Sequence, residues 1–126
     1  MKLKLEHEFE LTVGEDTFKG LFVDLTKKET KKLDEYSPTD ELKKASKLQR
    51  KIKVANEKNK PKLENELDEL IDIIDSYDTE KLYLERLTLS IKGDDKDAIL
   101  AIGEQYGYSR VFDTIIEDIA ERKEGN

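Results

Sequence analysis

Residues 40–78 read DELKKASKLQRKIKVANEKNKPKLENELDELIDIIDSYD, and this stretch consists of two halves of opposite charge. From Lys43 to Lys62 there are nine basic residues and one acid, whereas from Glu64 to Glu80 there are eight acids and no base. Apolar residues recur every three or four positions in each half, as on one face of a helix: Leu42, Ala45, Leu48, Ile52 and Ala55, then Leu63, Leu67, Leu70, Ile71, Ile74 and Tyr77. Pro61 suits the first turn of a new helix. The stretch therefore predicts an antiparallel, coiled-coil-like helical-hairpin arm over residues 40–78, whose first helix reaches about Lys58.

The opposite charges favour pairing of the basic helix with the acidic one, although each exposed pair contributes only about 0.2–1 kcal/mol. The same pattern disfavours pairing between the basic helices of two copies. We expect the arm to neutralise the positive charge of residues 43–62 internally. The sequence leaves open whether the two helices fold back within one chain or are exchanged between chains through an opened turn at Pro61, and therefore leaves open a homo-oligomer.

The N-terminal residues 3–25 predict a β-hairpin. Every second residue from Leu3 to Val13 belongs to one face of the first strand, and five of these six are Leu, Phe or Val, the sixth being His7. The intervening residues are charged or polar, as on the exposed face of a strand. Gly14-Glu15-Asp16 supplies the turn, because Gly14 can adopt a positive φ. Gly20, in the second strand, indicates a bulge or a close approach of another segment.

The rest of the chain predicts helices. Thr26-Lys27-Lys28-Glu29 forms a capping-box pattern and opens a short helix over residues 27–36. Residues 80–123 form a C-terminal helical segment, in which residues 82–92 fit either a helix or a strand, with a preference for helix because acids and caps precede them. Gly107 is the expected end of one helix and Ser109 the cap of the last. The fold class is thus α+β, mostly α, in a single domain over residues 1–126: a β-hairpin packed on helices, with a helical-hairpin arm.

Composition narrows the range of functions. The 126-residue chain is 42% charged, carries a net charge of −7 and contains no cysteine. The charged and apolar residues alternate at the N-terminus, unlike a signal peptide, and no stretch has the roughly 18 apolar residues of a membrane span. We therefore expect a cytoplasmic protein that does not enter a membrane.

Catalytic signatures are absent from the sequence. His7 is the only histidine, and the six glycines are scattered, so acyl-transfer triads, histidine metal sites and phosphate-binding loops lack their parts. Asp94-Asp95-Lys96-Asp97 lacks the spacing of an EF-hand and fits a helix start better. We expect no enzyme activity, no cofactor and no metal.

Nucleic-acid binding is an alternative reading of the basic stretch. The candidate contacts are Lys43, Lys44, Lys47, Arg50, Lys51 and Lys53. This stretch lacks interleaved aromatic residues on which bases stack, and an acidic helix is expected beside it. Residues 101–110 also resemble the turn of a helix-turn-helix, but the helix that follows presents acids, which repel phosphate.

Protein binding is the preferred function. A thin β-hairpin, a charged arm and short C-terminal helices do not readily enclose an active site, but they can close around a partner protein. The candidate partner-binding residues are apolar ones of the hairpin and the last helix: Phe18, Phe22, Val111, Phe112 and Ile115. The exposed strand of the hairpin offers a second mode, because it can pair with a strand of a partner.

The layout resembles the small tail-assembly chaperones of phages and prophages. The resemblance rests on Phe18-Lys19-Gly20, on the exit Leu25-Thr26-Lys27-Lys28-Glu29 into a helix, and on the segment from Gly93 to Ile119 with Tyr106-Gly107-Tyr108. It implies a small, acidic, helix-rich, non-enzymatic protein that holds a tape-measure or tail-tube subunit before assembly. The arm of residues 40–78 departs from the short members of that family, and no functional residue is carried over.

Overall fold

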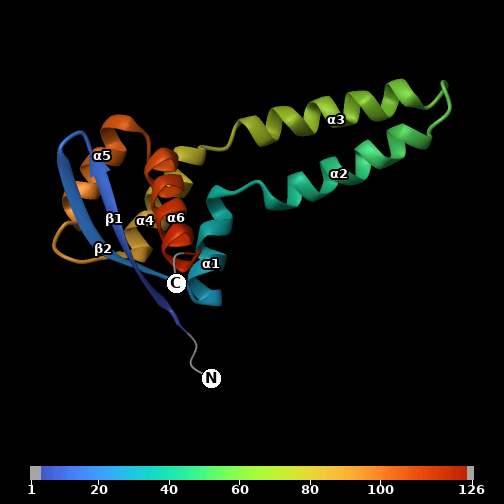
Figure 1. Ribbon diagram of the computed structural model, residues 1–126. Coiled ribbons are helices and arrows are strands. Elements are labelled where there is room, and N and C mark those ends of the chain that lie inside the picture. Colours follow the sequence, from blue (N-terminus) through green and yellow to red (C-terminus); the bar gives the residue numbers. More distant parts are fainter. Residues whose placement is uncertain (1–3, 125–126) are drawn as a thin grey trace. The chain divides into compact units, whose positions relative to one another are not determined.

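The computed structural model describes residues 4–124, which form two compact units. The sheet unit comprises residues 4–33 and 79–124, and the arm unit comprises residues 34–78 (Figure 1). The predicted hairpin residue Leu3 lies outside the described residues. The expectation of one domain over residues 1–126 stays a prediction. Among the described residues, no helix combines the length and the apolar character needed to cross a membrane.

The sheet unit contains a three-stranded antiparallel sheet in the order β1-β2-β3. Strand β1 (Glu6–Val13) pairs with β2 (Asp16–Val23), which pairs with the short β3 (Ile91–Lys92). Gly14 opens the two-residue turn between β1 and β2 with a φ of 63°, as the sequence predicted. A positive φ at the first residue of a two-residue turn gives the turn a twist that matches the twist of the two paired strands.

The core of the sheet unit follows the alternation of β1. His7, Phe9 and Leu11 are buried, whereas Glu6, Glu8, Glu10 and Thr12 are exposed. The buried face packs against three helices: α4 (Thr79–Ser90), α5 (Lys96–Tyr106) and α6 (Tyr108–Glu124). These contribute Leu87, Ile99, Val111, Ile115 and Ile119 to one core cluster. The predicted β-hairpin packed on helices is confirmed.

Gly20 permits a close approach rather than a bulge. It lies opposite Phe9 in an unbroken register. A Cβ at this position would stand 3.0 Å from the carbonyl oxygen of Lys92 and 3.0 Å from the ring of Phe9. The absence of a side chain therefore lets β3 and the buried ring meet at the centre of the sheet.

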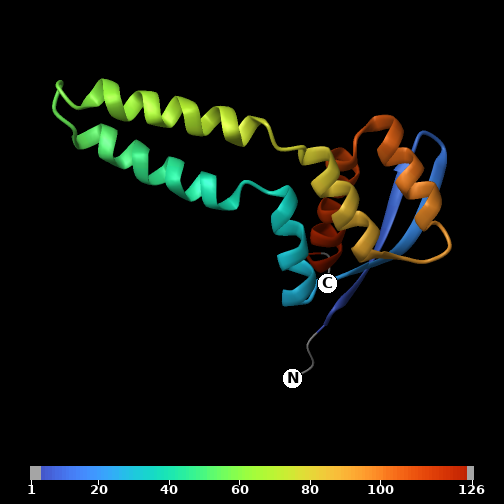
Figure 2. The same ribbon diagram turned by 180° about the vertical axis from the view of Figure 1, so that it is seen from behind.

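The capping box predicted at Thr26 is present. The backbone N–H of Thr26 donates to Glu29 Oε1 (3.1 Å), and the backbone N–H of Glu29 donates to Thr26 Oγ1 (3.2 Å). These bonds begin α1 (Lys27–Leu33), which continues as a 3₁₀ turn over Asp34–Tyr36. Helix α1 packs against α4 (Figure 2).

Residues 82–92 are mostly helical, with a short strand at the end. Helix α4 continues to Ser90, and only Ile91 and Lys92 pair with β2. Gly93 follows with a φ of 129°, a conformation that ends regular structure at low cost only for glycine. The preference for helix is therefore correct up to Ser90, and of the alternating Leu87, Leu89 and Ile91 only Ile91 lies in a strand.

Helix α5 ends at Gly107 as predicted, but the start of α6 differs from the prediction. The Gly107 N–H donates to the carbonyl of Gly103. Helix α6 already begins at Tyr108, and its first N–H groups are not capped by Ser109. Instead, the carboxylate of Glu80 accepts from the N–H of Tyr108 (2.7 Å) and from the N–H (3.4 Å) and Oγ (2.8 Å) of Ser109.

The arm unit is the predicted antiparallel helical hairpin. It consists of α2 (Thr39–Val54) and α3 (Lys60–Asp75), with Pro61 in the first turn of α3. Helix α2 ends four residues earlier than predicted. The segment after it forms a turn in which the N–H of Asn59 donates to Asn56 Oδ1 (3.0 Å), and such side-chain bonds compete with helix.

Candidate partner-binding site

Three of the five candidate partner-binding residues are core residues. Phe22, Val111 and Ile115 are between 0% and 4% exposed and belong to the core cluster of the sheet unit. The side chains of Phe22 and Ile115 are not available to a partner, which corrects the surface role expected for them. That of Val111 reaches the surface only at the floor of the groove described below. The apolar spacing that singled them out is also the pattern of a helix or strand face that packs inward.

The other two, Phe18 and Phe112, are half-buried and pack on the same core. The ring of Phe112 lies 5.9 Å from that of Phe22 and 5.2 Å from that of Tyr83, measured between centroids. Arg86 places its guanidinium 5.1 Å from the centroid of Phe22. Burial lowers the pKa of Arg86, against the attraction of Asp24 and Glu29. This aromatic cluster joins β2, α4 and α6, so its role is structural.

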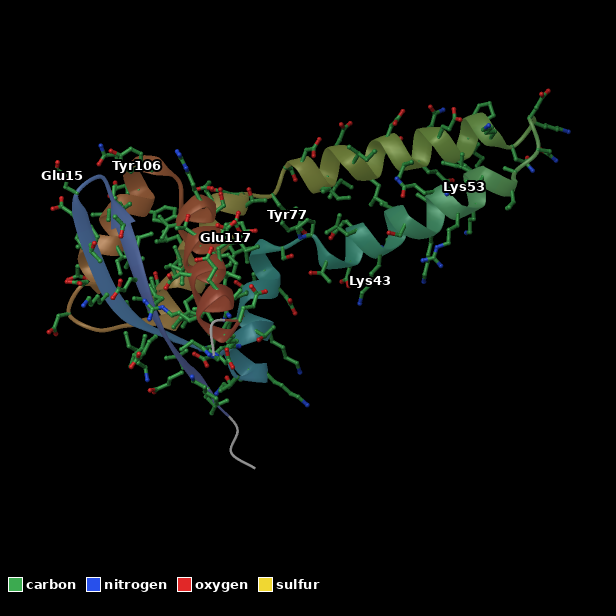
Figure 3. All side chains as sticks on the ribbon, viewed as in Figure 1. Glu15, Lys43, Lys53, Tyr77, Tyr106 and Glu117 are labelled. Atoms are coloured by element: carbon green, nitrogen blue, oxygen red, sulfur yellow. The ribbon has the colours of Figure 1, made fainter. Side chains whose placement is uncertain are left out.

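The basic candidates for nucleic-acid binding lie together on α2. Lys43, Lys44, Lys47, Arg50 and Lys51 are all exposed, as is Lys53, and Figure 3 shows Lys43 and Lys53 extending from the helix. Within residues 4–124, no carboxylate of α3 lies within 4.0 Å of any of these cationic groups. The two helices therefore pair through their apolar face, while their charges remain apart.

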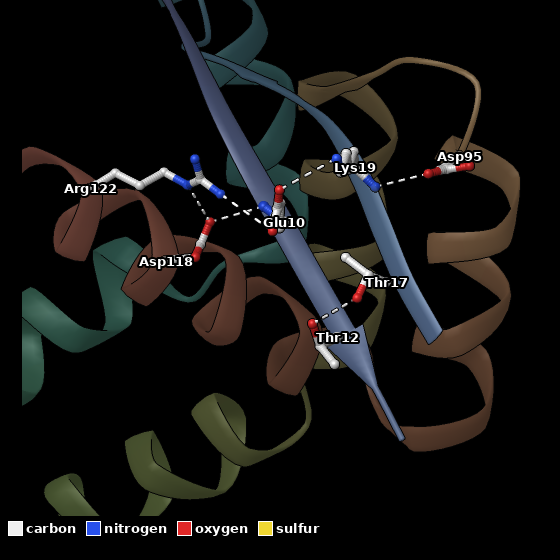
Figure 4. A network of polar contacts seen from close by, with 7 residues as sticks. All are labelled: Glu10, Thr12, Thr17, Lys19, Asp95, Asp118 and Arg122. Carbon is white, nitrogen blue, oxygen red and sulfur yellow. Dashed lines mark hydrogen bonds and ion pairs between the residues drawn. The ribbon is translucent and has the colours of Figure 1, made fainter. Parts of the chain in front are cut away.

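Carboxylates occupy both open edges of the β1–β2 pair (Figure 4). Asp118 of α6 accepts from the N–H of Glu10 (2.9 Å), and Asp95 accepts from the N–H of Lys19 (2.8 Å). Burial acts to raise the pKa of Asp118, but the N–H of Glu10 and the side chain of Arg122 outweigh it and hold that pKa below its usual range. Arg122 donates to Asp118 at 2.9 Å and stands 3.7 Å from Glu10.

These contacts restrict the strand-pairing mode expected from the sequence. The N–H of Glu10 points away from β2, and residues of a strand that are two apart point their N–H groups the same way. An added strand would need these outward groups, and the carboxylate of Asp118 already occupies one of them. Side chains that block an edge are a common protection against unwanted pairing.

A groove remains open at the far end of β1, beyond Asp118. It encloses about 330 Å³ and is lined by residues of β1, α5 and α6: Leu11, Thr12, Val13, Ile102, Tyr106, Arg110, Val111 and Thr114. The side chains of Leu11 and Val111 are almost fully buried and form an apolar floor, and Tyr106 and Arg110 are exposed at its edge. Apolar grooves with a few polar groups are the usual form of a ligand site.

Two polar groups of this groove have no partner among the described residues. No carboxylate lies within 4.0 Å of the Arg110 guanidinium. Thr12 lies two positions after Glu10, so its N–H also points away from β2, and no backbone or side-chain acceptor binds it in residues 4–124. The groove therefore presents one strand-edge N–H, one cation and an apolar surface.

The sequence singled out only Val111 among these residues as a partner contact. Arg110 is followed in the same helix by Asp113, Glu117 and Asp118, and a base among these acids was the signal that the sequence offered. The groove brings together residues 11–13, 102–106 and 110–114, which only the packing of α5 and α6 against β1 makes neighbours.

The lone histidine lies at the other end of β1. His7 is buried, and its Nε2 stands 3.2 Å from Asp24 Oδ1, while its Nδ1 has no hydrogen-bond partner in the described part of the chain. Residues 4–124 contain no group of three or more side chains placed to hold a metal ion.

Comparison with known proteins gave no relative. No family model, no curated protein and no solved structure matches this chain.

Proposed function

We propose that this chain is a non-enzymatic protein-binding factor that holds a partner polypeptide before assembly, as the phage and prophage tail-assembly chaperones that it resembles do. The observation that carries this proposal is the groove at the end of β1, with its apolar floor and its unpaired Arg110. A cytoplasmic location, expected from the sequence, stays a prediction.

The chemistry of the groove defines the partner segment. The outward N–H of Thr12 accommodates one backbone carbonyl of an extended segment. Leu11 and Val111 favour an apolar side chain, and Arg110 favours a carboxylate beside it. The groove therefore fits a short extended segment that carries one apolar and one acidic residue.

A peptide selection tests this proposal. The intact chain is used to select binders from a displayed library of random peptides, and the dissociation constant of a selected peptide is then measured by fluorescence anisotropy. We expect an acidic residue next to an apolar one in the selected peptides. Arg110→Gln should weaken binding by about ten- to a hundredfold, since a charged hydrogen bond contributes roughly 1.5–3 kcal/mol. Arg110→Lys should weaken it less.

The matched control is Arg50→Gln, which removes an exposed arginine from α2 of the arm unit. This variant should bind the selected peptide with unchanged affinity. Peptides without acidic residues, or equal binding by Arg110→Gln and the unchanged chain, would contradict the proposal.

Nucleic-acid binding through α2 is the second candidate function. It is favoured by the exposure of Lys43, Lys44, Lys47, Arg50 and Lys51 without a carboxylate within 4.0 Å in the described residues. A gel-shift titration at increasing salt tests it, because contacts to phosphate release counterions and weaken steeply with salt. Binding at low salt that is lost when these residues are replaced by Gln would support nucleic-acid binding. The absence of any shift at low salt would exclude this function.

A further inference from the structure

The arm unit leaves most of its apolar face uncovered. Among the residues of α2 and α3, only Ala45 is buried. The apolar positions between the helices, such as Leu48, Leu67 and Leu70, are half-buried, and Leu42 (50%) and Ile73 (49%) are exposed. Two helices alone cannot enclose an apolar stripe, and helical hairpins with such a stripe are usually covered by further helices.

One side of the arm unit carries a groove with two oppositely charged banks. Its floor consists of Leu48, Leu70 and Ile73. Lys44, Lys47 and Lys51 of α2 form the basic bank, and Glu66 and Glu69 of α3 form the acidic bank. Since no ion pair within 4.0 Å crosses the groove in the described residues, both banks are free to pair with charges from outside.

We propose that a second copy of this chain covers this groove, so that two arm units form a four-helix bundle with their Pro61 turns at the same end. Both banks line one groove, so they stand at the same height along the hairpin. A two-fold axis parallel to the helices leaves each residue at the same position along the bundle and places the left side of one groove over the right side of the other. It therefore places the basic bank of each copy over the acidic bank of the other, and basic and acidic helices alternate around the bundle.

The other simple arrangement brings like charges together. A two-fold axis across the helices, with the Pro61 turns at opposite ends, places Lys44, Lys47 and Lys51 over the same residues of the second copy. It likewise places Glu66 and Glu69 over their own counterparts. Like charges facing each other oppose association, so the charge pattern selects the first arrangement.

The size of the contact sets the expected affinity. Helices α2 and α3 have 16 residues each, and at 1.5 Å per residue they are about 24 Å long. Two helices about 10 Å wide then offer roughly 500 Å² per copy, at the low end for protein interfaces. The dimer should therefore dissociate on dilution and weaken as salt screens the two banks.

Spin-label distances test the arrangement. The chain contains no cysteine, so Lys58→Cys near the Pro61 turn and Asp40→Cys at the start of α2 each give one labelling site per copy. The proposed bundle predicts distances between copies of about 20 Å or less at both positions, because all four helices are neighbours or diagonal.

The two other arrangements give different distances. Turns at opposite ends, with Lys47 over its own counterpart, predict about 30 Å or more at position 58 but only about 20 Å at position 40, so position 58 separates this arrangement from the proposed bundle. Exchange of α3 through one continuous helix predicts a short distance at position 58 and roughly 50 Å at position 40. Either result, or no coupling between copies at concentrations near 1 mM, would overturn the proposal.

A charge-swap experiment provides an independent test. The swapped variant exchanges the banks through Lys44→Glu, Lys47→Glu, Lys51→Glu, Glu66→Lys and Glu69→Lys, so attraction within each hairpin and within its own dimer is retained. Circular dichroism checks that its helix content equals that of the unchanged chain. Mixed with the unchanged chain, the swapped variant should form far fewer mixed dimers by native mass spectrometry than the statistical half, because like banks then face each other. Mixed dimers at or above one half would contradict the proposal.

This inference does not depend on the proposed peptide groove. The dimer uses α2 and α3, whereas the peptide groove uses β1, α5 and α6. Arg110→Gln should therefore leave the spin-label distances unchanged, so each proposal can fail without the other.

Discussion

Three carboxylates of the sheet unit bind backbone N–H groups that are distant in the sequence. Glu80 binds the start of α6, Asp95 binds Lys19 and Asp118 binds Glu10. Each completes a hydrogen bond that the end of a helix or the edge of a strand lacks. These single residues therefore contribute to how α4, α5 and α6 are held against the sheet.

Replacement of Glu80 by Gln should lower the stability of the sheet unit by about 1 kcal/mol, as the loss of a helix cap usually does. The hydrogen bonds from Ser109 and Tyr108 lower the pKa of Glu80. The charged carboxylate thus stabilises the fold above its unfolded pKa, and this contribution is lost as the pH falls through the lower, folded pKa. Urea unfolding at pH 7 should separate Glu80→Gln from the unchanged chain, and the difference should shrink in acid.

The control is Glu117→Gln, at an exposed position within α6 (Figure 3). No hydrogen bond or ion pair in the described residues involves the Glu117 side chain, so this change should leave stability unchanged. Equal effects of the two replacements would show that Glu80 acts only through its charge.

Gly103 should not tolerate alanine, although alanine normally favours a helix by about 1 kcal/mol over glycine. A Cβ at position 103 would lie 2.5 Å from the ring of Tyr108, so the ring must move. We expect Gly103→Ala to lower the melting temperature of the chain. With Tyr108→Ala already present, the same change should instead be neutral or stabilising. A loss of stability in both backgrounds would mean that the ring is not the cause.

At the scale of elements, the edge of β1 depends on α6. Asp118→Ala removes the carboxylate that accepts the Glu10 N–H at 2.9 Å. Hydrogen exchange of the Glu10 amide should therefore accelerate about tenfold, while the Phe9 amide, which faces β2, should keep its protection. Unchanged exchange at Glu10 would show that the edge is protected by other means.

Elements whose signals are local could be predicted from the sequence. The alternation in β1, the Thr26–Glu29 capping box and Pro61 each act within a few residues, and all three are present as expected. The cap on α6 could not be predicted, because Glu80 and Tyr108 are 28 residues apart. Likewise, apolar spacing in α6 marks an inward face but does not distinguish the core from a binding surface, which is why Ile115 was assigned to a partner.

At the scale of the molecule, charge and apolar surface are divided between the two units. The sheet unit covers its own core and leaves one groove with Arg110 unpaired in the described residues. The arm unit leaves an apolar stripe between two banks of charge. The sequence predicted the two charged helices, but it placed their charges in contact with each other. The apolar side chains between the helices keep the banks apart, so the charges remain available to a second chain.

The most direct test of this account is whether the apolar floor of one arm contacts that of a second copy. An equal mixture of ¹³C-labelled and unlabelled chains allows nuclear Overhauser effects between copies to be recorded selectively. We predict effects between the methyl groups of Leu48 in one copy and those of Leu70 and Ile73 in the other. No effects between copies, or effects joining Leu48 only to its own counterpart, would contradict the account.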